Sequence, residues 1–327
     1  MDSGTHLAFG LGLGGLALID PVIASEPYGP LAAFIGTIAG SQAPDMDTLL
    51  KLKSNADYIK NHRGLSHSFP AVACWTVLIT LALSLAFPGV SWWHLGLWVL
   101  LAVLVHVLSD LFNSYGTQAF RPVTRKWVAW NVIHIFDPFI FGAHLAALLV
   151  WVIGWARPNV VFPALYGLLA LYYAWRSAVY RRLCARIPSC DPERREGDQY
   201  TLLPTVNLRR WNLVRQSADC TFAIGEWDHG AVHWIEHTKC DIHPAVEASK
   251  KNKDVQALLA VTPFPCAHVK EQAWGYEVRW IDIRYRHRKQ YPFVATVMMD
   301  ASYKAIQSYV GWMSDERLEK RLRMNAY

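Results

Sequence analysis

Hydrophobic and polar positions are unevenly distributed along this 327-residue chain. Long apolar runs fill the part before about Tyr180, whereas the remainder has the mixed pattern of a soluble domain. A helix needs roughly 17–25 mostly apolar residues to cross a bilayer. The runs that approach or meet this length are Leu7–Ile19 (continuing weakly to Ala24), Leu31–Ala43, Ala71–Phe87, Trp92–Phe112, Phe139–Trp155 and Val160–Tyr180. They predict an α-helical, multi-pass membrane domain of about six segments over residues 1–187.

From Ser189 onward the pattern changes to the alternation that is typical of strands. Two alternating runs flank the turn sequence Asp-His-Gly at 228–230, which favours a hairpin. The expected elements are strands at Thr221–Trp227, Ala231–Lys239, Tyr276–Arg286 and Phe293–Met299, followed by a charged helix at Ser302–Met324. We therefore expect a small α+β domain over residues 188–327.

Charge supports this division and suggests an orientation. Charged residues make up only 18% of the chain, which is low for a soluble protein. Lys and Arg are found in the loops at 44–70 and 113–138 and after Trp175, and are absent from 20–30 and 88–93. Because positively charged loops remain on the cytoplasmic side, this alternation places both termini and the C-terminal domain in the cytoplasm. The net charge of +6 then reflects anchoring beside anionic lipid, and no nucleic-acid partner is expected.

The N-terminus and the cysteines add two further expectations. No basic stretch precedes the first apolar run, so a cleavable signal peptide is not expected. The cysteines form no Cys-x-x-Cys pair, which argues against a disulfide framework or a zinc ribbon and fits a reducing compartment. They are Cys74, Cys184, Cys190, Cys220, Cys240 and Cys266.

Residues of the kinds that bind metals gather at the ends of the apolar runs. They are His6, Asp45, Asp47, His62, His67, His106, Asp110 and Asp137. In the orientation given by the charges, all of them lie at the cytoplasmic face, although the charge count did not require this. Each has an ordinary alternative: a hydrogen-bonded core histidine, a helix cap or a polar loop residue. Their common location favours a single metal site. Asp137 is better explained as a helix cap than as a ligand, and His134 is a still weaker candidate for a ligand.

The pair His106 and Asp110 is the strongest single indication of a metal site. Their spacing of four places both side chains on one face of a helix. Burying a carboxylate in an apolar segment costs on the order of 3 kcal/mol. A divalent cation, with zinc the expected metal, offsets that cost and accepts neutral imidazole as well. In the C-terminal domain, His229, His233 and His237 are better explained as surface residues of the hairpin than as ligands.

These motifs together resemble a known family. They are Met1-Asp-Ser-Gly-Thr-His6, Gly40-Ser-Gln-Ala-Pro-Asp45-Met-Asp47, Asn61-His62-Arg63-Gly64-Leu65-Ser66-His67-Ser68 and His106-Val-Leu-Ser-Asp110-Leu-Phe-Asn113-Ser-Tyr-Gly-Thr-Gln. They resemble the YdjM-type inner-membrane metal-dependent hydrolases, in particular the YfhP-like branch. The resemblance covers roughly Met1–Trp155, and the C-terminal domain is similar to the extension of that branch. It implies a bacterial plasma-membrane protein with hydrolase activity.

A fainter likeness is to zinc-dependent phospholipase C and the P1-type nucleases, whose ligand order also runs His, Asp, His, His-x-x-x-Asp. That likeness carries over His6, Asp45 or Asp47, His62 or His67, His106 and Asp110. Those enzymes also use a later His-x-x-x-Glu and a ligating N-terminal tryptophan. This chain begins with Met1 and has no convincing His-x-x-x-Glu after Asp110, so the likeness implies a core of one or two metals.

The function expected from the sequence is metal-assisted hydrolysis of a phosphoester or similar ester. The expected ligands are His6, Asp45, His67, His106 and Asp110. Asp47 and His62 are candidates for a positioning residue or general base, and Arg63 for steadying an anionic group or, alternatively, for an ordinary loop charge. The site's position suggests a lipid-linked or amphipathic substrate at the bilayer. The alternatives are a metal-ion transporter or sensor and a membrane scaffold with a structural metal; the sequence sets no oligomeric state.

Overall fold

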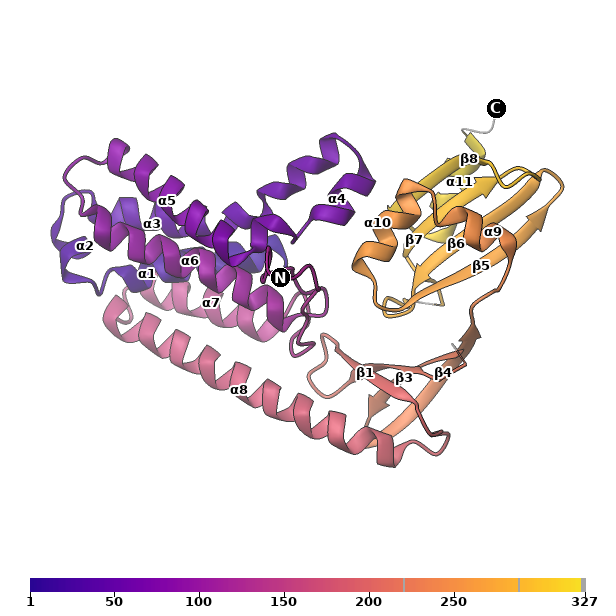
Figure 1. Cartoon of the computed structure of the whole chain (residues 1–327). Coiled ribbons are helices and arrows are strands. Elements are labelled where there is room, and N and C mark those ends of the chain that lie inside the picture. The colour runs from indigo at the N-terminus through magenta and orange to yellow at the C-terminus, as the bar shows by residue number, and fades with distance from the viewer. Residues whose placement is uncertain (220, 288, 325–327) are drawn as a thin grey trace. The chain divides into compact units, whose positions relative to one another are not determined.

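A computed structural model describes residues 1–219, 221–287 and 289–324 (Figure 1). The chain divides into two compact units. Unit 1 consists of Met1–Asp47, Arg63–Leu183 and Pro204–Leu208. Unit 2 consists of Thr48–His62, Cys184–Leu203 and the residues from Arg209 onward. A short polar segment between two parts of unit 1 therefore belongs to unit 2.

Unit 1 is helical. Its elements are α1 (Ser3–Ala17), α2 (Pro21–Ser25), α3 (Gly29–Gln42), η1 (Ala43–Leu52), η2 (Leu65–His67), α5 (Phe69–Ala86), α6 (Trp92–Phe112), α7 (Pro138–Val152) and α8 (Pro158–Cys190). Helix α1 packs against α3, α6 and α7, and α3 packs against α5 and α6. Glycines permit the closest approach, because a Cβ at Gly10 would collide with Ser41 of α3. The last residues of η1 and α8 extend into unit 2.

The prediction of about six membrane-spanning segments is not supported. Among the described residues, α5 and α6 are long and apolar enough to cross a bilayer, and α7 is apolar but shorter. Helix α1 has 15 residues and α3 has 14, so each rises only about 21–23 Å, less than a hydrocarbon core of about 30 Å. Helix α5 leaves Val77, Leu81 and Leu85 exposed, as a lipid-facing helix would.

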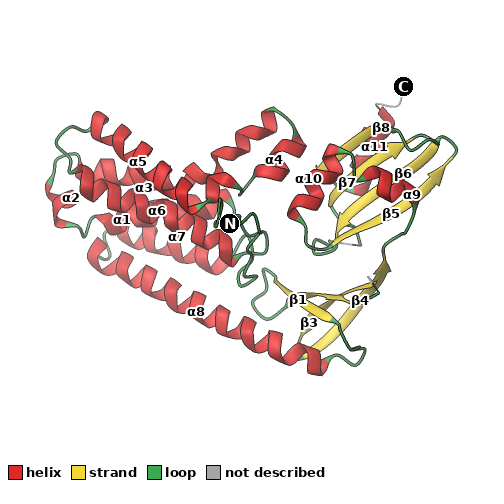
Figure 2. Cartoon of the chain, viewed as in Figure 1, coloured by secondary structure: helices red, strands yellow, loops and turns green. Residues whose placement is uncertain are grey.

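Unit 2 contains two four-stranded sheets (Figure 2). The first has the order β1 (Gln199–Pro204), β2 (Trp211–Gln216), β3 (Thr221–Asp228) and β4 (Ala231–Lys239). The second has the order β5 (Pro265–Gln272), β6 (Gly275–Asp282), β7 (Phe293–Met299) and β8 (Ala305–Trp312). The helices of this unit are α4 (Asn55–Asn61), α9 (Pro244–Ser249), α10 (Lys253–Val261) and α11 (Asp315–Met324). A C-terminal domain of helices and strands is therefore confirmed.

Two expectations for this half of the chain are wrong. Residues 305–312 form β8 rather than the start of a terminal helix, which is confined to Asp315–Met324. The strand is specified by antiparallel pairing with β7, for example Val294 with Gly311, which a local pattern does not reveal. Cys240 and Cys266, 26 residues apart, are joined by a disulfide, against the expectation of reduced thiols. Cys220 lies outside the described residues.

Candidate metal centre

Helix α6 provides the base of the site. His106 and Asp110 lie one turn apart and point into unit 1, where each is at most 1% exposed. The i, i+4 spacing brings His106 Nε2 to 3.8 Å from Asp110 Oδ2. Asn113 lies on the same helix face and donates from Nδ2 to Asp110 Oδ1 at 3.1 Å. Asn113 was not among the residues singled out from the sequence, although its i+3 spacing from Asp110 could have identified it.

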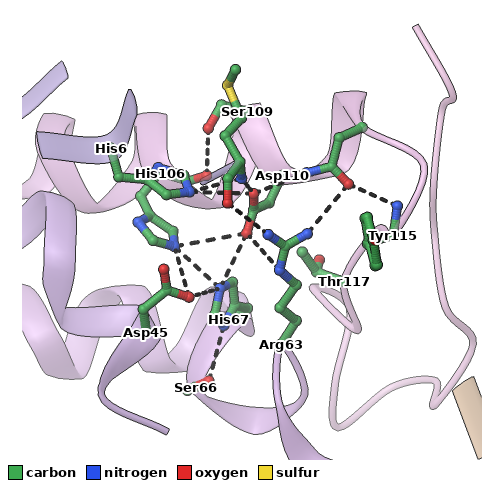
Figure 3. A network of polar contacts seen from close by, with 12 residues as sticks. His6, Asp45, Arg63, Ser66, His67, His106, Ser109, Asp110, Tyr115 and Thr117 are labelled. Atoms are coloured by element: carbon green, nitrogen blue, oxygen red, sulfur yellow. Dashed lines mark hydrogen bonds and ion pairs between the residues drawn. The ribbon is translucent and has the colours of Figure 1, made fainter. Parts of the chain in front are cut away.

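Two short 3-10 helices bring the other donors. Asp45 lies at the start of η1, just after α3, and His67 ends η2, just before α5. In Figure 3, His67, His106, Asp45 and Asp110 converge, and one donor atom from each lies within 4.8 Å of all the others. The ligands that the sequence places far apart therefore meet in unit 1.

Hydrogen bonds indicate which nitrogen of each imidazole carries the proton. His106 Nδ1 lies 2.6 Å from the carbonyl oxygen of Ser41, which can only accept, so Nδ1 carries the proton. The hydroxyl of Ser66 donates to Asp47 Oδ2 at 2.5 Å and therefore accepts from His67 Nδ1 at 2.9 Å. The Nε2 lone pairs of both histidines are thus directed into the cluster, 3.1 Å apart.

The carboxylates meet these nitrogens with oxygen atoms that are otherwise unsatisfied. Among the described residues, Asp45 Oδ1 and Asp110 Oδ2 are buried without a hydrogen-bond partner. They lie 3.5 Å and 3.3 Å from His67 Nε2, respectively. Buried oxygens and nitrogens that all lack protons repel one another. Arg63 and the Met1 amino group supply positive charge at Asp110, and a cation between the four donors would relieve the repulsion among all of them. The donor set therefore fits a divalent metal ion, and its mixture of imidazole and carboxylate suits zinc.

The protonation states outside the apolar helices agree with this assignment. Burial lowers the pKa of His67 to about 4, so its imidazole is neutral at pH 7. Burial raises the pKa of Asp45, but the close contact with His67 and the nearby charges outweigh burial and hold that pKa well below its usual range. A neutral imidazole and an ionised carboxylate are the forms that bind metal.

His6 joins the cluster from α1. Its ring stacks on that of His106 with centroids 3.7 Å apart, and its Nε2 lies 3.3 Å from Asp110 Oδ1. The amino group of Met1 contacts Asp110 Oδ1 and lies 2.8 Å from the same nitrogen of His6. His6 therefore lies beside the four converging donors rather than among them.

Arg63 is buried beside the same carboxylate and is not an ordinary loop charge. Its Nε lies 3.2 Å from Asp110 Oδ2, while Nη1 and Nη2 donate to Asn113 Oδ1 at 3.3 Å and to the Met1 carbonyl at 2.9 Å. Its side chain is only 6% exposed. The backbone has φ of 59°, an uncommon value for a residue with a Cβ.

Three further candidates from the sequence lie outside the set of four converging donors. Asp47 lies behind His67 and accepts from the Arg63 N–H and from Ser66. His62 is the C-cap of α4, and its ring stacks on Tyr58. One of its nitrogens lies within 4.8 Å of a carboxylate oxygen of Asp45 and of Asp47, so these three residues form a second group of possible ligands. Asp137 caps α7 by accepting from the N–H groups of Phe139 and Ile140, and it accepts from Tyr172.

The histidines outside the cluster serve local contacts. His134 Nδ1 bonds to the carbonyl of Phe136. His229 occupies the turn between β3 and β4, and His233 and His237 lie exposed on β4. His237 Nε2 lies 2.9 Å from a carboxylate oxygen of Glu193. None of these histidines belongs to a metal-type cluster among the described residues.

Comparison with known proteins agrees with the position of the cluster. Residues 1–183 match the family model described as YdjM inner membrane protein, and residues 244–322 match the model described as YfhP C-terminal alpha/beta plait domain. The chain belongs to the YdjM family. It is also 42% identical over 330 residues to a Bacillus subtilis (strain 168) protein, "Uncharacterized protein YfhP", with all of both chains covered. No solved structure matches. The converging donors all fall within the YdjM region, and α9, α10 and the β5–β8 sheet lie within the plait region.

Proposed function

We propose that this YdjM-family chain is a membrane-bound metal-dependent hydrolase. A divalent cation, with zinc the expected metal, is held by Asp45, His67, His106 and Asp110, with His6 beside them as a further donor. The observation that supports this most strongly is the convergence, within 4.8 Å, of two imidazole nitrogens and two buried carboxylate oxygens that accept no hydrogen bond. The expected substrate class is a phosphoester or similar ester.

Each residue around the centre has a distinct task in this proposal. A divalent cation held there supplies Lewis acidity and lowers the pKa of a water molecule. Arg63 keeps a permanent positive charge beside Asp110, which favours an anionic group at the centre. Asp47 orients His67 through Ser66 and holds its Nε2 toward the donors. His62 belongs to a second group with Asp45 and Asp47 rather than to the four donors, and we assign it no step.

The position of the donors along the apolar helices suggests the kind of substrate. His67 comes two residues before α5, and Asp110 comes two residues before the end of α6. The donors therefore collect at one end of the two helices that are long enough to span a bilayer. A centre at such an end favours a lipid-linked or amphipathic ester. The basic loops at 44–70 and 113–138 favour the cytoplasmic face, and with it a cytoplasmic C-terminal domain.

A scaffold with a structural metal is the second candidate. If all four donors bind one zinc ion at once, they complete the tetrahedron that zinc prefers and leave no position for a substrate, whereas hydrolysis requires that water or substrate also reaches the metal. The four-residue cluster is compatible with that closed arrangement. A transporter is less consistent, because its polar residues are expected near the middle of the spans.

Hydrolysis of ester panels by the full chain in detergent or liposomes tests the proposal. Phosphomonoesters, phosphodiesters and carboxyl esters, each with and without an acyl chain, are offered to wild type, Asp110→Asn and Asp137→Asn. We expect cleavage of at least one ester class, loss of it after chelation, and recovery with added zinc. Asp110→Asn should be inactive, and Asp137→Asn, a buried aspartate outside the centre, should be active. Tightly bound metal with no cleavage of any ester would instead support the scaffold.

A further inference from the structure

The segment between Asp47 and Arg63 connects the metal centre to the C-terminal plait domain, which we define as residues 244–322. Residues 48–62 pack within unit 2, whereas the residues at both of their ends belong to unit 1. Those end residues are part of the candidate centre. This loop could not be assigned to the C-terminal half from its sequence, because it is short and polar.

Helix α4, within this segment, is held by the plait domain. Ala56 is only 7% exposed and belongs to one hydrophobic cluster with Val255 and Leu258 of α10 and Val310 of β8. Asn55 Nδ2 donates to the carbonyl of Val310 at 3.4 Å. A helix of 7 residues is unstable by itself in water, so its conformation depends on this packing.

The two ends of the segment are joined at the centre. The N–H of Arg63 donates to Asp47 Oδ2 at 2.9 Å and closes the loop on itself. From this junction, Asp47 reaches His67 through Ser66, and the side chain of Arg63 reaches Asp110. A displacement of the loop therefore acts on a ligand imidazole and a ligand carboxylate at once.

We propose that the plait domain positions the metal centre through α4, with Ala56 and Asn55 as the positioning residues. This inference rests on the proposed metal site. When α4 is docked, the Asp47–Arg63 junction is fixed and the donors converge; when it is released, the junction relaxes and metal binding weakens. Because such coupling is reciprocal, metal binding also stabilises the docked form of α4.

Metal affinity in matched variants of the full chain tests the coupling. Ala56→Gln places a large polar side chain in the cluster, Lys60→Gln places the same side chain at an exposed position of α4, and Ala56→Ser keeps the position small. We expect Ala56→Gln to weaken zinc binding on the order of fivefold or more in competition with a chromophoric chelator. It should also shift the visible spectrum of the cobalt(II)-substituted protein. Lys60→Gln and Ala56→Ser should match wild type in both measurements.

Hydrogen exchange supplies the reverse measurement. Adding zinc to the wild-type chain should slow exchange in peptides that cover 55–61. If Ala56→Gln unfolds the plait domain, Asn55→Ala is used instead, because it removes only the hydrogen bond to the Val310 carbonyl. It should likewise weaken zinc binding and shift the cobalt(II) spectrum. Wild-type affinity and spectrum in the α4 variants, with no change in exchange, would overturn the coupling alone. A wild-type chain that binds no metal would overturn the proposed function as well.

Discussion

His67 and His106 face each other across the centre with their Nε2 atoms 3.1 Å apart. Two ligands about 2.0–2.1 Å from a tetrahedral zinc ion are about 3.3–3.4 Å from each other. The two imidazoles are therefore already spaced almost as two corners of a zinc tetrahedron. The opposite side of each ring is anchored, His106 to the carbonyl of Ser41 and His67 to the hydroxyl of Ser66. The predictions below follow from this preorganisation.

Asp47→Asn should weaken metal binding without removing a ligand. The carboxylate orients His67 through Ser66, and loss of such a supporting group typically costs about 10- to 100-fold in metal affinity. Asp241→Asn is the control, because Asp241 also accepts a backbone N–H but lies in unit 2. Zinc dissociation constants for both variants provide the check. Equal affinities would mean that Asp47 does not orient His67.

Asp137→Asn should lower stability while the metal is retained. Asp137 accepts from two N–H groups at the start of α7 and from Tyr172, and loss of a cap costs about 0.5–2 kcal/mol. Thermal unfolding in detergent and zinc content, measured on the same preparation, separate the two effects. A loss of zinc at unchanged stability would instead make Asp137 a ligand.

Arg63→Lys should reduce turnover of anionic substrates more than turnover of neutral ones. Lysine keeps the charge but cannot reproduce the planar fork that contacts Asp110, Asn113 and the Met1 carbonyl. We expect turnover of an anionic phosphodiester to fall by about tenfold or more, because a misplaced charge stabilises the transition state less. Turnover of a neutral ester should change less. An equal loss for both would assign Arg63 to the structure of the centre rather than to the anion.

The stability of the β1–β4 sheet should depend on pH through Asp191. Burial raises the pKa of this carboxyl, but bonds from Tyr200, Trp234 and Arg215 outweigh it and lower the pKa below its usual value. A lowered folded-state pKa contributes stability above about pH 4 that is lost as the pH falls through the folded value. Asp191→Asn should therefore unfold at lower urea concentration at neutral pH and show a flatter acid dependence. Parallel pH profiles of the two proteins would contradict this.

The sequence was sufficient where chemistry and spacing are local. The His106–Asp110 pair, the hairpin around His229 and the strand Phe293–Met299 all follow from short-range periodicity, and the structure has each of them. The sequence was insufficient for elements and bonds that depend on contacts between residues far apart along the chain. Strand β8 is specified by its pairing with β7, and the disulfide joins Cys240 to Cys266, 26 residues away along the chain.

Three further features also required coordinates. Whether an apolar run spans a bilayer depends on the length of helix that forms, and α1 and α3 are short. Ser66 orients His67 through its hydroxyl and Ser41 orients His106 through its backbone carbonyl, and no sequence pattern marks either contact. The polar loop between Asp47 and Arg63 has no periodicity that would assign α4 to the plait domain.

Zinc content after purification without added metal tests the central claim most directly. Wild type is compared with His106→Ala and with His144→Ala, because His144 is equally buried and also bonds a backbone carbonyl but lies outside the cluster. The account predicts at least about one zinc ion per chain in wild type and His144→Ala, and little or none in His106→Ala. Equal zinc content in all three proteins, or none in wild type, would contradict it.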